Sequence, residues 1–169
     1  MKKIYSVIKG TGSYIPEKVV KNEDFLNNTF FENYDKPITE RDTADVIQKF
    51  YEITGIKERR YVNNGLGNSD IATIAAQRAI ETSGIDPETL DYIIVGHNYG
   101  EAKNGANVDI VPSIAARVKN KLQIKNPWCV AYDLPFGCPG WVQGIIQADY
   151  YIKSGDVKRV LVIWSEILS

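Results

Sequence analysis

The sequence has 169 residues, of which 44% are hydrophobic and 24% charged, an ordinary composition for a globular protein. We therefore expect one domain over residues 1–169. Its 20 Lys and Arg against 21 Asp and Glu give a formal net charge of −1, so no overall field favours nucleic acid or an anionic membrane as a partner. Charged residues interrupt every hydrophobic run before the roughly 20 apolar residues of a membrane span, and no signal-peptide core is present. We expect a cytoplasmic protein.

The first half of the chain shows weak patterning. Residues 4–9 (IYSVIK) predict a strand, and a polar stretch follows it. Apolar residues at helical spacing predict a helix over 43–53. A second helix is predicted over 70–83, with Ser69 as its N-cap and Gly84 as its C-terminal stop.

The second half of the chain alternates regularly between strands and helices. Its strands are nearly continuous apolar runs, which is typical of a parallel sheet buried on both faces by helices. The alternation predicts an α/β fold class. The expected elements are a strand over 92–97, a helix over 112–122, a strand over 128–132, a helix over 138–153 and a strand over 159–164.

Cys138 is the strongest candidate for chemistry. Residues 133–140 (DLPFGCPG) join a predicted buried strand directly to a long apolar helix, which places this thiol at a helix start. Unpaired backbone N–H groups and the positive end of the helix dipole stabilise a thiolate there. Pro139 suits the first helical turn, where a missing N–H costs nothing. On local sequence alone, a buried structural cysteine explains the residue equally well.

The other candidate groups point away from metal or disulfide chemistry. The sequence has two cysteines, too few for a disulfide framework, and a single histidine, too few for a multi-histidine site. We expect no metal. His97 follows a buried strand and is better explained as a satisfied strand-end histidine than as a catalytic one. Cys129 falls within a predicted strand and is most simply a core residue.

Several collinear segments resemble the ketoacyl-synthase III family of thiolase-superfamily condensing enzymes. The resemblance spans the whole chain and implies a thiolase-like fold, of which this chain forms the N-terminal half: a mostly parallel sheet with helices on both faces, belonging to a five-layer αβαβα duplicated fold. The segments that carry it are residues 10–17 (GTGSYIPE), 54–60 (TGIKERR), 112–116 (PSIAA) and 151–159 (YIKSGDVKR), in family order around Cys138.

The resemblance implies a two-step reaction without a tightly bound cofactor. An acyl group passes from a coenzyme A thioester to Cys138, whose backbone N–H also serves as an oxyanion donor, and a decarboxylating malonyl-acyl carrier protein then attacks it. The product belongs to fatty acid or polyketide-like biosynthesis. The family's catalytic histidine and asparagine lie in a second half that this chain does not contain, so we expect the chain alone to be inactive.

The chain departs from the family pattern around the nucleophile. Phe136 and Pro139 replace small residues, and Trp141 follows on the predicted helix, so these three are candidates for substrate binding. The departure keeps two alternatives open. One is a specialised ketosynthase or acyltransferase that uses an aryl, branched or longer acyl donor. The other is a non-catalytic partner subunit.

Three further residues follow from the resemblance. Lys49 and Ile53 align with the tryptophan and arginine that hold coenzyme A, which makes Lys49, together with Arg59, a candidate for binding its phosphates. The family forms homodimers in which a loop of one protomer closes the acyl pocket of the other. Val111 matches the pocket-lining position of that loop, although an anchor within its own subunit is an equally simple explanation.

Overall fold

The computed structural model describes residues 3–62, 65–102 and 108–168. The chain packs as two compact units. The first consists of Met1–Tyr14 and Asn64–Ser169, and the second of Ile15–Asn63. The first unit contains the regular alternation of strands and helices, and the second contains the polar stretch.

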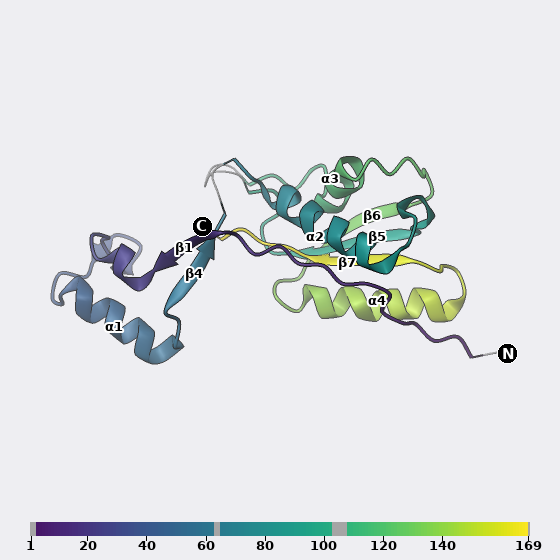
Figure 1. Cartoon of the computed structure of the whole chain (residues 1–169). Helices are drawn as coiled ribbons and strands as arrows, with labels where there is room; N and C mark the ends of the chain where they lie inside the picture. The colour runs from purple at the N-terminus through teal and green to yellow at the C-terminus, as the bar shows by residue number, and fades with distance from the viewer. Residues whose placement is uncertain (1–2, 63–64, 103–107, 169) are drawn as a thin grey trace. The chain divides into compact units, whose positions relative to one another are not determined.

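Among its described residues, the first unit is built on a three-stranded parallel sheet in the order β6-β5-β7. Tyr92 at the start of the central strand pairs with Val130 on one side and Val160 on the other. Helices α2 and α3 cover one face of this sheet and α4 covers the other (Figure 1). The predicted α/β class is therefore confirmed. The bounds are α2 Asn68–Ser83, β5 Tyr92–His97, α3 Ile114–Lys121, β6 Val130–Pro135, α4 Gly140–Ser154 and β7 Val160–Trp164.

The central strand β5 forms the middle of the core. Ile93, Ile94 and Val95 are each 0% exposed, because helices cover both faces of the strand. Alternation of polar and apolar residues is absent for the same reason. Burying each such side chain stabilises the fold by about 1.5–3 kcal/mol. The helices supply small partners, among them Ala72 of α2 and Ala115 of α3.

The start of α2 differs from the predicted one. The N-cap is Gly67 and not Ser69, and the Gly67 N–H donates to Asp70 Oδ2 over 2.8 Å. A Cβ on Gly67 would lie 2.0 Å from Glu101 Oε1, so a larger residue there would require the Glu101 side chain to move. Ser69 is instead buried inside the first turn, where its N–H donates to Glu101 Oε2. The predicted stop at Gly84 is confirmed, with φ of 65°.

The strand predicted over residues 4–9 is not formed. This segment pairs with no strand of the described sheet, and its apolar residues Tyr5, Val7 and Ile8 remain 70–74% exposed. The segment is instead tied down by side chains: Ser6 Oγ donates to Asp149 Oδ1 over 2.5 Å. The prediction was wrong because the apolar run buries neither face, and a strand is stabilised by burying one.

The second unit holds one predicted helix and short strands that the sequence pattern did not indicate. Helix α1 (Thr43–Thr54) is capped by the Asp42 carboxylate and ends at Gly55, whose φ is 68°. Strands β1 (Lys18–Lys21) and β4 (Glu58–Tyr61) pair antiparallel. A short 3-10 helix (Asn22–Phe25) follows β1, and β2 (Phe31–Asn33) pairs with β3 (Lys36–Pro37).

Candidate active site

Cys138 lies in an exposed turn between β6 and α4. The helix begins at Gly140, two residues later than predicted, with Pro139 at its N-cap. The turn leaves the carboxyl end of a parallel strand, which is the edge where open α/β sheets place binding groups. The thiol is therefore accessible at the N-terminal end of a 15-residue helix.

Glycines set the path of the chain on both sides of this thiol. Gly137 adopts φ of 70°, a left-handed conformation that costs other residues about 1 kcal/mol or more. A Cβ on Gly96 of β5 would lie 2.9 Å from the carbonyl carbon of Gly140, so α4 starts in direct contact with the central strand. This close approach fixes where the helix begins relative to the sheet.

His97, at the end of β5, is fully satisfied inside the fold. It is 2% exposed, its Nδ1 accepts the Gly100 N–H over 2.9 Å, and its Nε2 lies 3.0 Å from Asp133 Oδ2. Because Nδ1 is an acceptor, the proton resides on Nε2 and is donated to the carboxylate. This geometry agrees with the expectation of a strand-end histidine.

Asp133 of β6 ties the sheet to α3. Its two carboxylate oxygens accept the N–H groups of Ile114 and Ala115 over 2.7 and 2.8 Å. Ser113 caps the same helix by accepting the Ala116 N–H over 3.1 Å. Two donors at the start of α3 are thus bonded to the strand that leads to Cys138, and a carboxylate at this end also suits the helix dipole.

The loop after β5 closes on itself at its base. The backbones of Glu101 and Asp109 exchange two hydrogen bonds of 2.7 and 3.0 Å, and residues 103–107 lie outside the described residues. Arg117 Nη2 donates to Asp109 Oδ2 over 2.6 Å, and the Val111 N–H donates to Asp109 Oδ1 over 3.0 Å. The hydrogen bonds from Val111 and from Arg117 lower the pKa of the Asp109 carboxyl. Val111 itself is 76% exposed.

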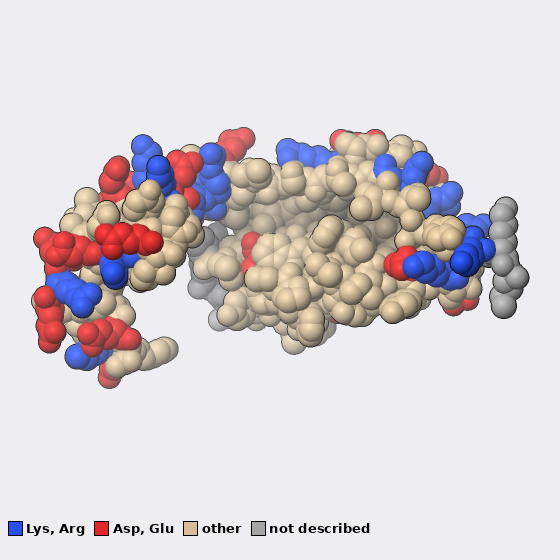
Figure 2. Space-filling view, turned by 90° about the horizontal axis from the view of Figure 1, so that it is seen from below, with Lys and Arg blue, Asp and Glu red and all other residues tan. Residues whose placement is uncertain are grey.

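The predicted substrate-binding residues lie around Cys138 with their side chains exposed. Phe136 is 61% and Trp141 45% exposed, and Pro139 is exposed as well. Trp141 begins an apolar stripe along α4 that continues with Val142, Ile146 and Tyr150. Figure 2 shows that the face of the first unit over this helix is largely free of charged side chains. The three residues are close together in sequence.

Lys49 and Arg59, the predicted phosphate-binding residues, lie in the second unit. Lys49 Nζ is 3.6 Å from Glu52 Oε2, and its side chain is 62% exposed. Arg59 donates to Asn22 Oδ1 over 3.0 Å and lies over the Phe25 ring at 5.0 Å. Lys49 thus forms an exposed ion pair, and Arg59 has local partners of its own.

Cys129 is a core residue, as expected. It is 3% exposed and packs in the main cluster of the first unit. Burial raises the pKa of its thiol, which keeps it protonated. Within the described residues, no group of three or more histidines, cysteines and carboxylates is arranged to hold a metal ion, and no helix is long and apolar enough to cross a membrane.

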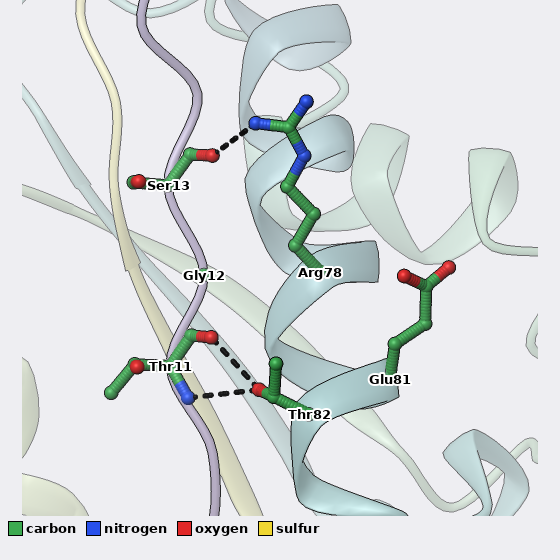
Figure 3. A pocket seen from close by; sticks show the side chains of 6 residues that line it. All are labelled: Thr11, Gly12, Ser13, Arg78, Glu81 and Thr82. Atoms are coloured by element: carbon green, nitrogen blue, oxygen red, sulfur yellow. Dashed lines mark hydrogen bonds between the residues drawn. The ribbon is translucent and has the colours of Figure 1, made fainter.

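A surface groove of about 510 Å³ lies between the N-terminal segment and the C-terminal part of α2 (Figure 3). Thr82 Oγ1 accepts the Thr11 N–H, and Arg78 donates to the Ser13 carbonyl over 2.6 Å. The start of α2 is bonded to the end of β7, and Arg78 is ten residues further along, or about 15 Å. The groove therefore lies away from Cys138, and its polar groups bond one another.

Three residues that the sequence analysis did not select surround the turn before Cys138. Trp164 Nε1 donates to the Gly137 carbonyl over 3.3 Å. A Cβ on Gly137 would lie 3.1 Å from Asn98 Oδ1, and the Asn98 N–H donates to Glu166 Oε2 over 2.5 Å. Asn98 directly follows one predicted strand and Glu166 lies two residues after another, and that position is the signal by which they could have been found.

Comparisons with known proteins agree with this geometry. Residues 132–169 match the family model of 3-oxoacyl-[acyl-carrier-protein (ACP)] synthase III. The chain is 35% identical over 168 residues to a beta-ketoacyl-[acyl-carrier-protein] synthase III of Xanthomonas euvesicatoria, covering 99% of this chain and 45% of the relative. It is 39% identical over 166 residues to a beta-ketoacyl-[acyl-carrier-protein] synthase III 1 of Vibrio vulnificus, covering 98% of this chain and 45% of the relative.

A solved structure extends the likeness to the fold. The crystal structure of 3-oxoacyl-[acyl-carrier-protein] synthase III from Aquifex aeolicus matches with a TM-score of 0.71 and 31% identity, covering 98% of this chain and 45% of that one. A parallel sheet between helical layers, with a cysteine in the turn ahead of α4, thus forms half of a thiolase-like fold. The chain belongs to the 3-oxoacyl-[acyl-carrier-protein] synthase III family and spans somewhat under half the length of these relatives.

Proposed function

We propose that this chain carries the acyl-accepting half of a ketoacyl-synthase III-type condensing enzyme. In the first step, the Cys138 thiolate attacks the carbonyl carbon of an acyl-coenzyme A. The carbonyl π electrons move onto oxygen, then return as the carbon–sulfur bond to coenzyme A breaks. The products are an acyl group on Cys138 and the coenzyme A thiolate, which takes up a proton.

The observation that carries this proposal is the placement of Cys138. The thiol is exposed in the turn immediately before α4, at the carboxyl edge of the parallel sheet. No described residue accepts a hydrogen bond from the Cys138 N–H, which leaves that donor available to the oxyanion formed during attack. By contrast, Cys129 is buried and protonated.

The second step forms the carbon–carbon bond. Malonyl-acyl carrier protein loses carbon dioxide, and the resulting carbanion attacks the acyl carbon on Cys138, releasing the thiolate and a β-ketoacyl thioester. Activation of the malonyl carbonyl falls to a histidine and an asparagine outside this chain, in a second half that packs against the apolar stripe of α4. Residues 1–169 alone therefore perform no condensation. The intact protein acts in the cytoplasm as a homodimer and takes part in fatty acid or related biosynthesis.

The same proposal assigns the candidate binding residues. Lys49 meets a phosphate of coenzyme A as a point charge, with Arg59 beside the same ligand. Phe136, Pro139 and Trp141 contact the acyl group at the nucleophile.

A specialised acyl donor is the second candidate function. Its supporting observation is the bulk beside the thiol, where the Phe136 and Trp141 side chains are 61% and 45% exposed and thus free to meet an acyl group. Aromatic side chains suit aryl, branched or longer donors better than an acetyl group. A panel of acyl-coenzyme A donors, compared by kcat/KM, separates the two functions. Clear preference for acetyl-coenzyme A would remove the reason for invoking specialisation.

Mass spectrometry tests the nucleophile directly. The full-length protein, incubated with an acyl-coenzyme A, is expected to gain one acyl mass on the peptide that contains Cys138, and Cys138→Ser is expected to gain none. Acylation of Cys129 with Cys138 unmodified would overturn the assignment. A protein that accepts no acyl group from the whole donor panel would instead fit the non-catalytic partner subunit.

A further inference from the structure

Glu166 is a carboxylate at the sheet edge beside Cys138, two residues after β7 ends. Its Oε2 accepts the Asn98 N–H over 2.5 Å. Its Oε1 is buried and has no hydrogen-bond partner among the described residues. A buried carboxylate oxygen without a donor is unfavourable, and the hydrogen bond that Oε2 accepts from Asn98 offsets part of that cost.

The contact made by Glu166 leads directly to the nucleophile turn. Asn98 follows the central strand β5, and its Oδ1 lies 3.1 Å from where a Gly137 Cβ would stand. The Trp164 indole N–H donates to the Gly137 carbonyl over 3.3 Å. Groups that follow β5 and end β7 thus lie beside the left-handed residue before Cys138.

The backbone next to Glu166 is itself tied to two elements. Ser165 is 5% exposed, and its N–H donates to the Gly96 carbonyl over 3.1 Å. Ser165 Oγ donates to Asn68 Oδ1 over 2.5 Å, and Asn68 in turn donates to the carbonyls of Gly100 and Ser165. Since Asn68 is 0% exposed, this buried network fixes the backbone of Ser165, from which Glu166 follows.

We propose that Glu166, acting through Asn98, is a positioning residue for Cys138. By accepting the Asn98 N–H, it fixes the backbone from which the Asn98 side chain extends beside Gly137, and so sets the direction in which the thiol leaves the turn. The inference rests on the proposed function of Cys138, which it deepens. An error of about 1 Å in placing a reacting group lowers rates by as much as about a hundredfold, so displacing the Cys138 thiol is expected to slow acyl transfer.

Two substitutions in the full-length protein separate positioning from simple packing. Glu166→Gln keeps a carbonyl oxygen that accepts the Asn98 N–H, and Glu166→Ala removes it. We expect Glu166→Ala to slow acyl transfer to Cys138 about tenfold and Glu166→Gln to stay within about twofold of the unsubstituted protein. Glu81→Ala, which removes an exposed carboxylate on α2, is the control and is expected to change nothing.

Alkylation of Cys138 by iodoacetamide gives a readout that needs no substrate. Glu166→Ala is expected to slow it about fivefold, with rescue by Glu166→Gln. Asn98→Ala, which keeps the backbone N–H but removes the contact with Gly137, is expected to slow both reactions in a folded protein. Rates in Glu166→Ala equal to the unsubstituted protein, or equal losses in Glu166→Gln and Glu166→Ala, would overturn the proposal. If no acyl-coenzyme A reacts but the alkylation pattern holds, the proposed function fails and the positioning role stands.

Discussion

The two cysteines of this chain differ in the property that decides thiol reactivity. Cys138 is exposed in a turn, whereas Cys129 is 3% exposed and burial raises the pKa of its thiol. Because the thiolate is the reactive form, we expect iodoacetamide to modify Cys138 alone in the folded protein and both residues in denaturant. Peptide mapping by mass spectrometry checks this. Modification of Cys129 at a comparable rate without denaturant would contradict the burial that the structure shows.

The hydrogen bonds that the Asp109 carboxylate accepts in the loop after β5 are expected to depend on pH. The hydrogen bonds from the Val111 N–H and from Arg117 lower the carboxyl pKa below its ordinary value of 3.8. The bonds therefore stabilise the loop fully above pH 3.8 and are lost as the pH falls through the lowered folded pKa. We expect the Val111 amide resonance to titrate with a midpoint below 3.8, and Arg117→Ala to raise that midpoint. A midpoint at or above 3.8 in the unsubstituted protein would show that the bonds are absent.

At the scale of elements, Asp133 joins β6, α3 and β5 through one carboxylate. Asp133→Ala removes the acceptor of the Ile114, Ala115 and His97 N–H groups. Since each orphaned donor costs about 1 kcal/mol or more, we expect the free energy of unfolding to fall by about 3 kcal/mol. Ser113→Ala, which removes only a helix cap, is the control at about 1 kcal/mol. Denaturant unfolding measures both free energies. Equal losses in the two variants would contradict the expectation that Asp133 joins three elements.

The contact between β5 and α4 makes a second prediction at this scale. A Cβ on Gly96 would meet backbone atoms of Gly140 and Trp141 at 2.9 and 3.1 Å, and backbone cannot rotate away. Gly96→Ala is therefore expected to lower the free energy of unfolding by about 1–3 kcal/mol and to displace the turn that bears Cys138. At Gly144 the nearest atom is a methyl of Val162, 2.7 Å away. Adding Val162→Ala to Gly144→Ala should accordingly restore part of the lost free energy of unfolding. No single side-chain truncation should do so for Gly96→Ala, because the clash there is with backbone.

How far the sequence predicts these elements depends on the kind of signal. The bounds of β5 were predicted correctly because a continuous apolar run has clear ends. The start of α2 shifted, because Gly67 caps it by donating to the Asp70 carboxylate, while the Ser69 N–H donates to Glu101, a residue distant in sequence. Residues 4–9 have the same composition as a strand but no face to bury. The local sequence pattern thus predicts buried strands and helices well. It predicts poorly the helix starts that involve residues distant in sequence.

Some residues of the candidate site could be predicted from the sequence, and others are recognised only in the folded structure. The placement of Cys138 between a strand and a helix was predicted from residues 133–140, whereas its role as the nucleophile was predicted from the family resemblance, because local sequence alone left a structural cysteine equally simple. Asn98, Trp164 and Glu166 were not selected, because their relation to Gly137 arises only when β5, β6 and β7 lie side by side. The role of Cys138 as nucleophile and those of Phe136, Pro139 and Trp141 stay predictions that the acylation experiments test.

At the scale of the whole molecule, Val111 is the residue through which the proposed homodimer would affect the acyl pocket. Its side chain is 76% exposed, and its backbone is held by Asp109, so the loop presents an apolar group outward in a fixed position. We propose that in a homodimer this side chain lines the acyl pocket of the partner subunit. A small residue there leaves room for extra methylenes of the acyl chain, each worth about 0.8 kcal/mol when buried.

Val111→Phe in the full-length protein is therefore expected to shorten the preferred acyl donor by one or two methylenes, because the larger ring fills the space that the chain end occupies. Since each lost methylene contact is worth about 0.8 kcal/mol, kcat/KM for the longer donors should fall by about fourfold per methylene. Alkylation of Cys138 by iodoacetamide should not change, because a small reagent does not need the pocket. Val108→Phe, on the same loop and 54% exposed, is the matched control. A chain-length profile that is identical in both variants and in the unsubstituted protein would leave Val111 as an anchor within its own subunit.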